Sequence, residues 1–278
     1  MKYILITGVS SGIGYDAVRL FLEKGYHVFG SVRKTSDKVR LQSEFQNNFT
    51  CLIFDVTQQE QITTAFDQVK TVLNGNHLSG LVNNAGLTMS GPMHLMSDDK
   101  FRHQMEVNLF GVRNVTNAFL PLLGAYRGFK GQPGKIVNIS SLAGVFNTPF
   151  NGAYCVSKHA VESLGEIYRR ELMLYGIDVV SIQSGPISSE IWKKNIGEMN
   201  EYMDSDYGEI LKKAEDIIKK YEGSTQPASV ISNLIYKILN TRSPKTSYIV
   251  SKNILQTWAL VKFLPARMVD RILWRMLC

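Results

Sequence analysis

Short strand-like runs of apolar and β-branched residues alternate with helical patterns along most of this chain. The runs lie at residues 2–6, 26–32, 49–54, 78–82, 135–139, 177–182 and 248–250. Strands that are joined through helices run parallel, because each connection must cross back over the sheet. The helices then cover both faces of that sheet. The sequence therefore predicts an α/β fold with a doubly wound parallel sheet of about seven strands.

The first run leads directly into a glycine-rich turn, Thr7-Gly8-Val9-Ser10-Ser11-Gly12-Ile13-Gly14, and apolar residues then recur with helical spacing. Glycines let the backbone approach a pyrophosphate closely, and the helix that follows offers free N–H groups and the positive end of its dipole. A strand, such a turn and a helix are typical of a Rossmann-type dinucleotide site. The spacing is Gly-x-x-x-Gly-x-Gly, and a glycine turn without special function is the alternative.

Tyr154 and Lys158 stand four residues apart in a helical pattern, so their side chains share one face. A free phenol has a pKa of about 10, too high for efficient proton transfer at neutral pH. A neighbouring ammonium favours the phenolate, lowers that pKa and makes the tyrosine a usable general acid or base. The pair Ser140-Ser141 ends an apolar run, and Ser141 lies thirteen residues before the tyrosine. An ordinary surface pair is the alternative interpretation of Tyr154 and Lys158.

Further motifs in the same order resemble those of the short-chain dehydrogenase/reductase family, closest in pattern to its retinol/steroid dehydrogenase-like carbonyl reductases. They are Asn83-Asn84-Ala85-Gly86, Glu106-Val107-Asn108 and Ser184-Gly185-Pro186-Ile187-Ser188-Ser189. The resemblance covers about residues 1–192 and implies catalytic roles for Asn108, Ser141, Tyr154 and Lys158. It also implies a homodimer or homotetramer that pairs long helices at about 98–126 and 152–175.

The same resemblance assigns residues to a bound cofactor. The predicted cofactor-binding residues are Gly8, Ser10, Ser11, Gly12, Ile13, Gly14, Arg33, Asp55, Val56, Asn83, Ala85, Gly86, Tyr154, Lys158, Pro186, Ile187 and Ser189. In this assignment Lys158 holds the nicotinamide ribose, Asp55 contacts the adenine ring, and Asn108 retains a water in the proton relay. A helix N-cap is a second interpretation of Asp55, compatible with the first.

The end of the second strand indicates which cofactor is bound. An acidic residue there would hydrogen-bond the ribose hydroxyls of NAD and repel a 2′-phosphate. The strand instead ends with Arg33-Lys34, and an arginine holds a phosphate through a bidentate fork. Ser10 or Ser11 would add a hydroxyl contact. The sequence therefore predicts NADP(H), with a solvated basic pair as the alternative.

These residues predict an NADP(H)-dependent oxidoreductase that interconverts a carbonyl and a primary or secondary alcohol by hydride transfer. Ser141 and Tyr154 would donate hydrogen bonds to the substrate oxygen, and Tyr154 would transfer the proton. The alternative is a dinucleotide-binding redox-sensing protein without significant turnover. A variable lid at 189–223 is rich in methionine and aromatic residues, which suits a hydrophobic substrate. The same residues would equally serve a helix that packs on the core.

Length and composition fit a single Rossmann-fold domain over residues 1–278, because 44% hydrophobic residues supply a large core. An amphipathic helical extension is expected at 254–278, where Arg267, Arg271 and Arg275 recur every four residues. This helix would lie in a membrane interface, or its apolar face would cover the substrate cleft or a partner subunit.

Charge, cysteine and hydropathy patterns exclude several other classes. The net charge is +7, yet the basic residues are dispersed and no nucleic-acid module is recognised, so no nucleic-acid partner is expected. Three cysteines far apart argue against a disulfide framework and for a cytoplasmic location, either free or peripheral to a membrane. We find no signal peptide, no apolar run long enough to span a bilayer and no metal-ligand spacing among the histidines.

Overall fold

A computed structural model of the chain contains a seven-stranded parallel sheet. The structure describes residues 1–188, 198–222, 225–251 and 264–277. The strands are β1 (Lys2–Ile6), β2 (Tyr26–Val32), β3 (Phe49–Ile53), β4 (Gly80–Asn83), β5 (Lys135–Ser141), β6 (Val179–Ser184) and β7 (Ser247–Val250). They pair in the order β3-β2-β1-β4-β5-β6-β7, and every pairing is parallel. The predicted doubly wound sheet is confirmed, with strand ends shifted by one or two residues from β3 onward.

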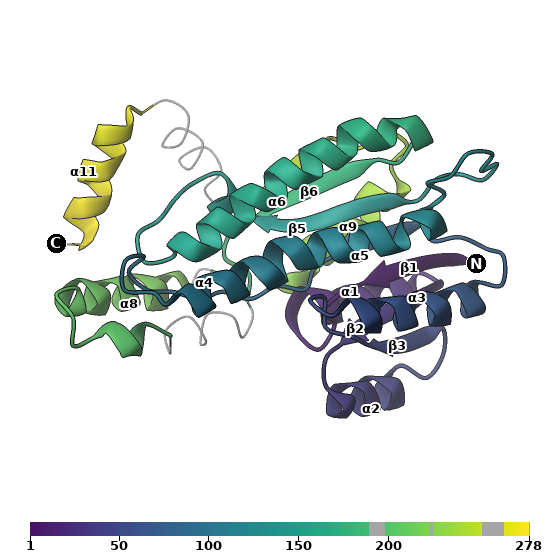
Figure 1. The fold of residues 1–278 in the computed structure, drawn as a ribbon, viewed down its shortest axis with the longest axis horizontal. Coiled ribbons are helices and arrows are strands. Elements are labelled where there is room, and N and C mark those ends of the chain that lie inside the picture. Colours follow the sequence, from purple (N-terminus) through teal and green to yellow (C-terminus); the bar gives the residue numbers. More distant parts are fainter. Residues whose placement is uncertain (189–197, 223–224, 252–263, 278) are drawn as a thin grey trace.

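Helices connect the strands and cover both faces of the sheet (Figure 1). They are α1 (Gly12–Glu23), α2 (Thr35–Glu44), α3 (Gln59–Leu73), α4 (Asp98–Met105), α5 (Gly111–Phe119), α6 (Gly152–Glu171), α8 (Gly208–Glu222), α9 (Ala228–Asn240) and α11 (Ala266–Leu277). One core lies between the sheet and α1, α2 and α9, and a second lies between the sheet and α3, α5 and α6. None of the described helices is both long enough and apolar enough to span a bilayer.

The two-residue period of a strand decides which core each side chain enters. In β1, Ile4 and Ile6 belong to the core under α1 and α9, whereas Leu5 belongs to the core under α3, α5 and α6. All three side chains are fully buried. Because both faces of the sheet are covered, a strand such as β1 reads as a continuous apolar run, which is why the sequence showed it clearly.

α4 and α5 form one long helix that is interrupted by a π-helical turn at Glu106–Phe110. Asn108 lies in this turn and is 1% exposed. The sequence predicted a long helix here but not its change of pitch. Since π turns inside α-helices often occur at functional sites, this one marks Asn108 for closer inspection.

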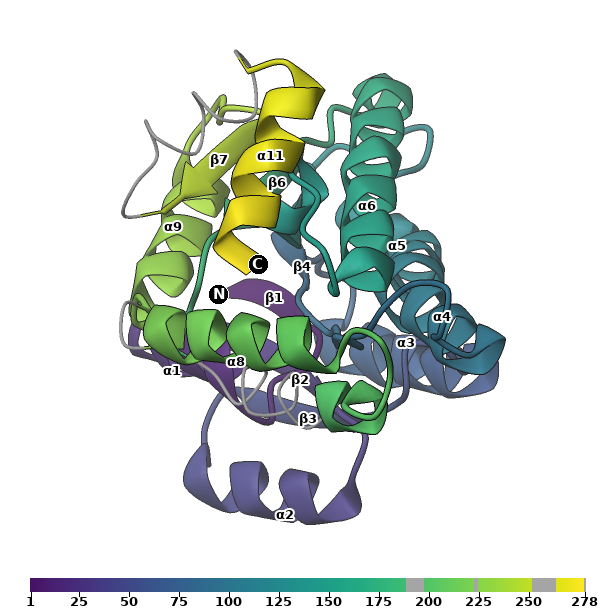
Figure 2. The ribbon, with the colours of Figure 1, turned by 90° about the vertical axis from the view of Figure 1, so that its left-hand side faces the viewer.

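The last part of the chain gathers at the carboxyl end of the strands. Figures 1 and 2 show α8 and α11 together at this end, and the two helices contact each other. Residues 189–197 and 223 of the predicted lid, and 254–263 and 278 of the predicted extension, lie outside the described residues. In the described part of the lid, Met199, Tyr202 and Leu211 are buried and pack against one another, so these three side chains serve packing.

Candidate active site

The glycine-rich turn follows β1 and runs into the first turn of α1. Gly8 has a φ of +70°, and a Cβ at this position would lie 2.9 Å from Cα of Ala85. A Cβ on Gly14 would lie 2.4 Å from the carbonyl oxygen of Gly8. Any other residue at these two positions would collide with backbone atoms. The turn therefore brings bare backbone to a helix N-terminus, where N–H groups lack partners within the helix.

Hydrogen bonds fix this turn against the loop that follows β4. Oγ1 of Thr7 accepts from the backbone N–H groups of Asn84 and Ala85, each at 2.9 Å. In return, Nδ2 of Asn84 donates to the carbonyl oxygens of Thr7 at 2.8 Å and Gly8 at 2.9 Å. Thr7 and Asn84 were not among the site residues predicted from the sequence. The sequence did offer one sign of their role, because each is a polar residue directly after an apolar strand, Thr7 after β1 and Asn84 after β4.

Asn83, a predicted cofactor-binding residue, joins three elements below this loop. Its Nδ2 donates to Oγ1 of Thr116 on α5 at 3.0 Å and to Oδ1 of Asn138 on β5 at 2.9 Å. The Asn83 side chain thus links β4, β5 and α5 near the carboxyl end of the sheet, and the residue is 3% exposed. Ala85 is half-buried and Gly86 exposed, so both of these predicted residues reach the surface of the loop.

Side chains from β2 and α2 support the turn from another side. Oγ of Ser31 on β2 accepts from the N–H of Gly8 at 3.1 Å. Nη2 of Arg40 on α2 donates to the carbonyl oxygen of Ser10 at 2.7 Å. Ser11 directly precedes α1, and its hydroxyl makes no capping hydrogen bond. Arg40, for which no role was predicted from the sequence, therefore ties the turn to α2, where it is also paired with Asp37 at 3.1 Å.

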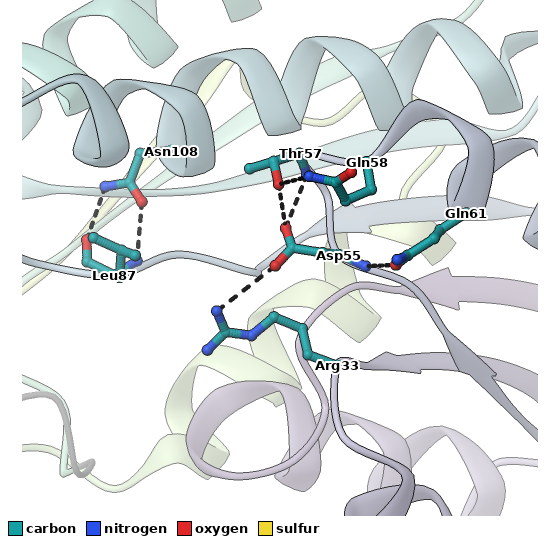
Figure 3. Close-up of polar contacts among 7 residues, drawn as sticks. All are labelled: Arg33, Asp55, Thr57, Gln58, Gln61, Leu87 and Asn108. Atoms are coloured by element: carbon teal, nitrogen blue, oxygen red, sulfur yellow. Dashed lines mark hydrogen bonds and ion pairs between the residues drawn. The ribbon is translucent and has the colours of Figure 1, made fainter. Parts of the chain in front are cut away.

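Arg33 is paired with a carboxylate at the end of the neighbouring strand. Its Nη1 lies 3.8 Å from Oδ2 of Asp55, which follows β3 (Figure 3). Oδ1 of Asp55 accepts from the N–H and the hydroxyl of Thr57, at 2.9 and 2.8 Å. The N-cap of α3 is Gln58, so the helix-cap interpretation of Asp55 is wrong, and its carboxylate closes a turn before the helix. The sequence of β2 shows no acidic residue, but the parallel pairing of β2 with β3 brings one close.

Three predicted cofactor residues reach a hydrophobic core: Ile13, Val56 and Ile187. Beyond β6, the carbonyl oxygen of Pro186 accepts from the N–H of Gln226 at 3.0 Å, which ties this segment to the residues before α9. Ser189 lies outside the described residues.

α6 directs Tyr154 and Lys158 to one side. Nζ of Lys158 donates to the carbonyl oxygen of Ile139 on β5 at 2.8 Å and lies 5.6 Å from the centre of the Tyr154 ring. Lys158 is 8% exposed, and Tyr154 is half-buried. The predicted shared face is confirmed, and it is turned toward the sheet and not toward open solvent.

Ser141 ends β5 and meets Tyr154, while Ser140 turns away. Successive strand residues point to opposite faces, and Ser140 is 2% exposed whereas Ser141 is half-buried. Oγ of Ser141 accepts from the N–H of Ala143 at 3.1 Å and donates to the carbonyl oxygen of Ser184 at 3.4 Å. Ser141 also hydrogen-bonds the Tyr154 side chain. This agrees with the thirteen-residue interval, which favoured Ser141 over Ser140.

Burial dominates the titration of the tyrosine and the lysine. Although Tyr154 is only half-buried as a residue, desolvation raises the pKa of its hydroxyl to about 12, and the hydrogen bond with Ser141 acts in the opposite direction. Burial lowers the pKa of Lys158 to about 8, and the carboxylate of Glu162 partly offsets this. The prediction that Lys158 holds the pKa of Tyr154 below its ordinary value is wrong for the protein by itself, because desolvation is the larger effect. Tyr154 therefore keeps its proton at neutral pH.

Asn108 holds the loop after β4 against α6. Its Oδ1 accepts from the N–H of Leu87, and its Nδ2 donates to the carbonyl oxygen of Leu87, each at 2.9 Å (Figure 3). Nδ2 also donates to Oγ of Ser157 on α6 at 3.0 Å. A Cβ on Gly86 would lie 3.3 Å from Oδ1 of Asn108 and 3.9 Å from Nζ of Lys158. The predicted cofactor loop, the π turn and α6 thus meet at one point.

Known proteins resemble this chain over almost its whole length. A family model described as short chain dehydrogenase matches residues 2–200. The NADPH-dependent 3-dehydrocapnine reductase of Ornithobacterium rhinotracheale is 40% identical over 275 residues, which cover 99% of this chain and 97% of the relative. Retinol dehydrogenase 16 of Homo sapiens is 30% identical, with 98% and 88% covered. A solved structure of ElxO with NADP bound has a TM-score of 0.71 at 25% identity, with 90% and 96% covered. The chain therefore belongs to the short-chain dehydrogenase/reductase family of oxidoreductases.

Proposed function

We propose that this protein is an NADP(H)-dependent oxidoreductase that interconverts the carbonyl group of a hydrophobic substrate and the corresponding alcohol. The observation that carries the proposal is the grouping of Ser141, Tyr154 and Lys158 at the carboxyl end of β5. The loop beside them is the one that Asn84 ties to the glycine turn. In open α/β sheets, ligands bind at this edge, where the strand order reverses between β1 and β4.

The residues present fit an NADP(H) cofactor. Gly8 and Gly14 leave bare backbone at the N-terminus of α1, as a pyrophosphate requires. Arg33 and Lys34 supply positive charge for a 2′-phosphate at the end of β2. The contact of Arg33 with Asp55 is an exposed ion pair, of a kind that contributes about 0–1 kcal/mol, so the guanidinium is free to turn to a phosphate. The names of two similar proteins, the NADPH-dependent reductase and ElxO with NADP bound, support this choice of cofactor.

Ser141, Tyr154 and Lys158 would then stabilise the negative charge that develops on the substrate oxygen. When bound, NADP(H) would provide the hydride for reduction of the carbonyl carbon or, in reverse, take it from the alcohol carbon. As negative charge builds on the oxygen, hydrogen bonds from Ser141 and Tyr154 stabilise it, and the Tyr154 hydroxyl transfers its proton there. Lys158 stabilises the phenolate left behind and would hold the nicotinamide ribose. Asn108 would retain a water that returns a proton from solvent.

Exposed apolar side chains in the loop that borders the start of α6 support a hydrophobic substrate. Met93, in the loop after β4, is 47% exposed, and its Sδ lies 2.7 Å from where a Cβ on Gly152 would be. Gly152 is two residues before Tyr154, so Met93 borders the start of α6. Leu95 in the same loop is 40% exposed. Exposed apolar side chains beside polar catalytic groups suit a ligand that is apolar except at its reacting carbon. Retinol dehydrogenase 16 is named for such an alcohol.

A panel of carbonyl and alcohol substrates, followed through the nicotinamide absorbance with NADPH, NADP, NADH and NAD, tests this function. We expect turnover of apolar aldehydes or ketones with NADPH, and of the matching alcohols with NADP. Cofactor binding without turnover across the panel would contradict the proposal and favour a redox-sensing protein.

Replacing Arg33 tests the choice of cofactor separately. Arg33→Asp should weaken NADPH binding by about 1–3 kcal/mol, the size of a lost charge-assisted hydrogen bond, and should leave NADH binding unchanged or improved. Arg170→Asp is the matched control, because Arg33 and Arg170 are both paired with a carboxylate and their side chains are 61% and 63% exposed. Dissociation constants from fluorescence titration provide the measurement. Equal affinity of the unchanged protein for NADPH and NADH would rule out the predicted preference.

A further inference from the structure

Helix α11 lies at the carboxyl end of the sheet (Figure 2), and its apolar side is incompletely covered. Leu277 is buried and Leu273 half-buried, and α11 contacts α8. Met268, Ile272 and Met276 are 46%, 37% and 49% exposed. Side chains four residues apart lie above one another on a helix, so these three form an exposed apolar stripe beside the packed side.

A stripe of arginine runs next to this apolar stripe. Arg267, Arg271 and Arg275 each precede a member of the apolar stripe by one position, which places the two stripes about 100° apart around the helix. All three are exposed, and none forms an ion pair or hydrogen bond with any residue that the structure describes. The acidic residue in α11 is Asp270, so the helix is basic overall. Trp274, which is 61% exposed, borders the arginine stripe on the side away from the apolar stripe.

We propose that α11 docks this protein onto the surface of an anionic lipid bilayer. The apolar stripe enters the boundary between head groups and acyl chains, and the unpaired arginines contact lipid phosphates. A second copy of this chain fits the surface less well, because a two-fold contact between α11 helices would bring two arginine stripes together.

Docking in this way turns the carboxyl end of the sheet toward the membrane. α11 and α8 stand at that end, where β5 also ends in Ser141 (Figures 1 and 2). A substrate dissolved in lipid then reaches Tyr154 without crossing water, a consequence that rests on the proposed function. The docking itself does not rest on the proposed function, since binding to vesicles is measured without turnover.

Flotation of the full-length protein with vesicles tests the proposal. We expect binding to phosphatidylglycerol vesicles at low salt, much weaker binding to phosphatidylcholine vesicles, and release at high salt. Reversal of the stripe by Arg267→Glu, Arg271→Glu and Arg275→Glu should weaken binding by on the order of a hundredfold or more, since each basic residue near an anionic surface contributes roughly fivefold. The matched control reverses three exposed charges at the opposite end of the sheet, by Arg127→Glu, Lys130→Glu and Arg242→Glu, and should bind like the unchanged protein.

A second variant separates a bilayer from a second copy of the chain. Met268→Ser, Ile272→Ser and Met276→Ser should reduce vesicle binding and leave the mass in solution, measured by light scattering, unchanged. If these replacements lower the mass and leave vesicle binding intact, the stripe is an interface between copies and the proposal is overturned. It is also overturned if the unchanged protein ignores phosphatidylglycerol vesicles, or if the arginine reversal and its control bind equally. Unchanged circular dichroism shows that each variant is folded.

Discussion

The loop after β4 and the lid segment, residues 198–222, lie at the same edge of the sheet but are held in different ways. Thr7 and Asn84 tie the loop to the glycine turn with four hydrogen bonds of 2.8–2.9 Å. The lid segment is held by apolar and aromatic packing of Met199, Tyr202 and Leu211 and by ion pairs of Glu198 and Glu201 with Lys100 of α4. Half-buried Phe150 joins that cluster from the loop before α6.

The contacts that hold the two regions differ in how strictly they fix the geometry of their partners. A hydrogen bond fixes distance and angle, so few replacements for Thr7 or Asn84 keep the turn in place. Apolar contacts have no such requirement, and similar side chains of similar total volume substitute for one another. The cofactor side of the site therefore tolerates little change. The packed side chains of the lid segment tolerate more replacements, as we expect of the region proposed to select the substrate.

The strongest test of the polar side is Tyr154→Phe. Loss of the hydroxyl should reduce turnover by about 10²–10⁴-fold, because the phenylalanine ring has no proton to transfer. NADPH affinity should stay within about twofold, since the rest of the site is unchanged. Steady-state kinetics and a binding titration measure the two effects, with Tyr126→Phe, at a 51% exposed position, as control. Turnover within tenfold of the unchanged protein would mean that another group supplies the proton.

The hydrogen bonds of Thr7 should have the next largest effect. Thr7→Val keeps the shape but leaves two backbone N–H groups without their acceptor, at a residue that is 2% exposed. We expect a loss of about 2–4 kcal/mol in the free energy of unfolding, together with weaker NADPH binding. Urea denaturation followed by circular dichroism is the measurement. Thr63→Val, at an exposed position on α3, should change stability by less than about 0.5 kcal/mol.

Leu211→Ala tests whether the lid segment is a separate unit. Leu211 and Leu81 are both 0% exposed, but Leu81 belongs to the core under α3, α5 and α6 and Leu211 to the lid cluster. Leu81→Ala should lower the free energy of global unfolding by about 2–5 kcal/mol. Leu211→Ala should lower it by about 1 kcal/mol or less and instead speed amide hydrogen exchange within 198–222. Equal global losses would mean that the lid unfolds only together with the sheet.

The smallest expected effect is a shift in pH dependence on replacing Glu162. Burial lowers the pKa of Lys158 to about 8, and Glu162 acts to raise it. If catalysis needs the ammonium, kcat/KM falls as pH rises through this pKa. Glu162→Gln removes the opposing charge, lowers the pKa of Lys158 further and moves the fall in kcat/KM to lower pH. The control is Glu166→Gln, one helical turn further along α6, which should leave the pH profile unchanged. A shift to higher pH would contradict the assignment.

Much of the fold followed from short windows of sequence. β1 and β2 begin and end at the predicted residues, because each is rich in apolar, aromatic and β-branched residues and has polar residues or a glycine turn beside it. The shared face of Tyr154 and Lys158 also follows from local geometry, since residues four apart on a helix are neighbours. The pairing of Arg33 with Asp55 could not be read in this way. It joins residues that are far apart in the chain and meet only because β2 and β3 are adjacent.

The roles of buried groups depended on the whole fold. A four-residue spacing suggested that Lys158 lowers the pKa of Tyr154, but desolvation raises that pKa to about 12. How much protein surrounds a hydroxyl is decided by β5, α6 and the loops between them, which no single window contains. The role of Asp55 also depended on the fold. An aspartate that caps a helix and one that closes a turn before the helix look alike in sequence, and only the start of α3 distinguishes them.

The sequence by itself determined the strands, the glycine turn and the helical face that carries Tyr154 and Lys158. These depend on backbone dihedrals and on the periods of strand and helix, which act over a few residues. Only the tertiary structure decided that the lid residues Met199 and Leu211 pack inward, and that Met268, Ile272 and Met276 of α11 stay exposed. An amphipathic pattern shows that a helix has an apolar side. What covers that side depends on contacts between segments distant in the chain, because burial is a property of the folded whole.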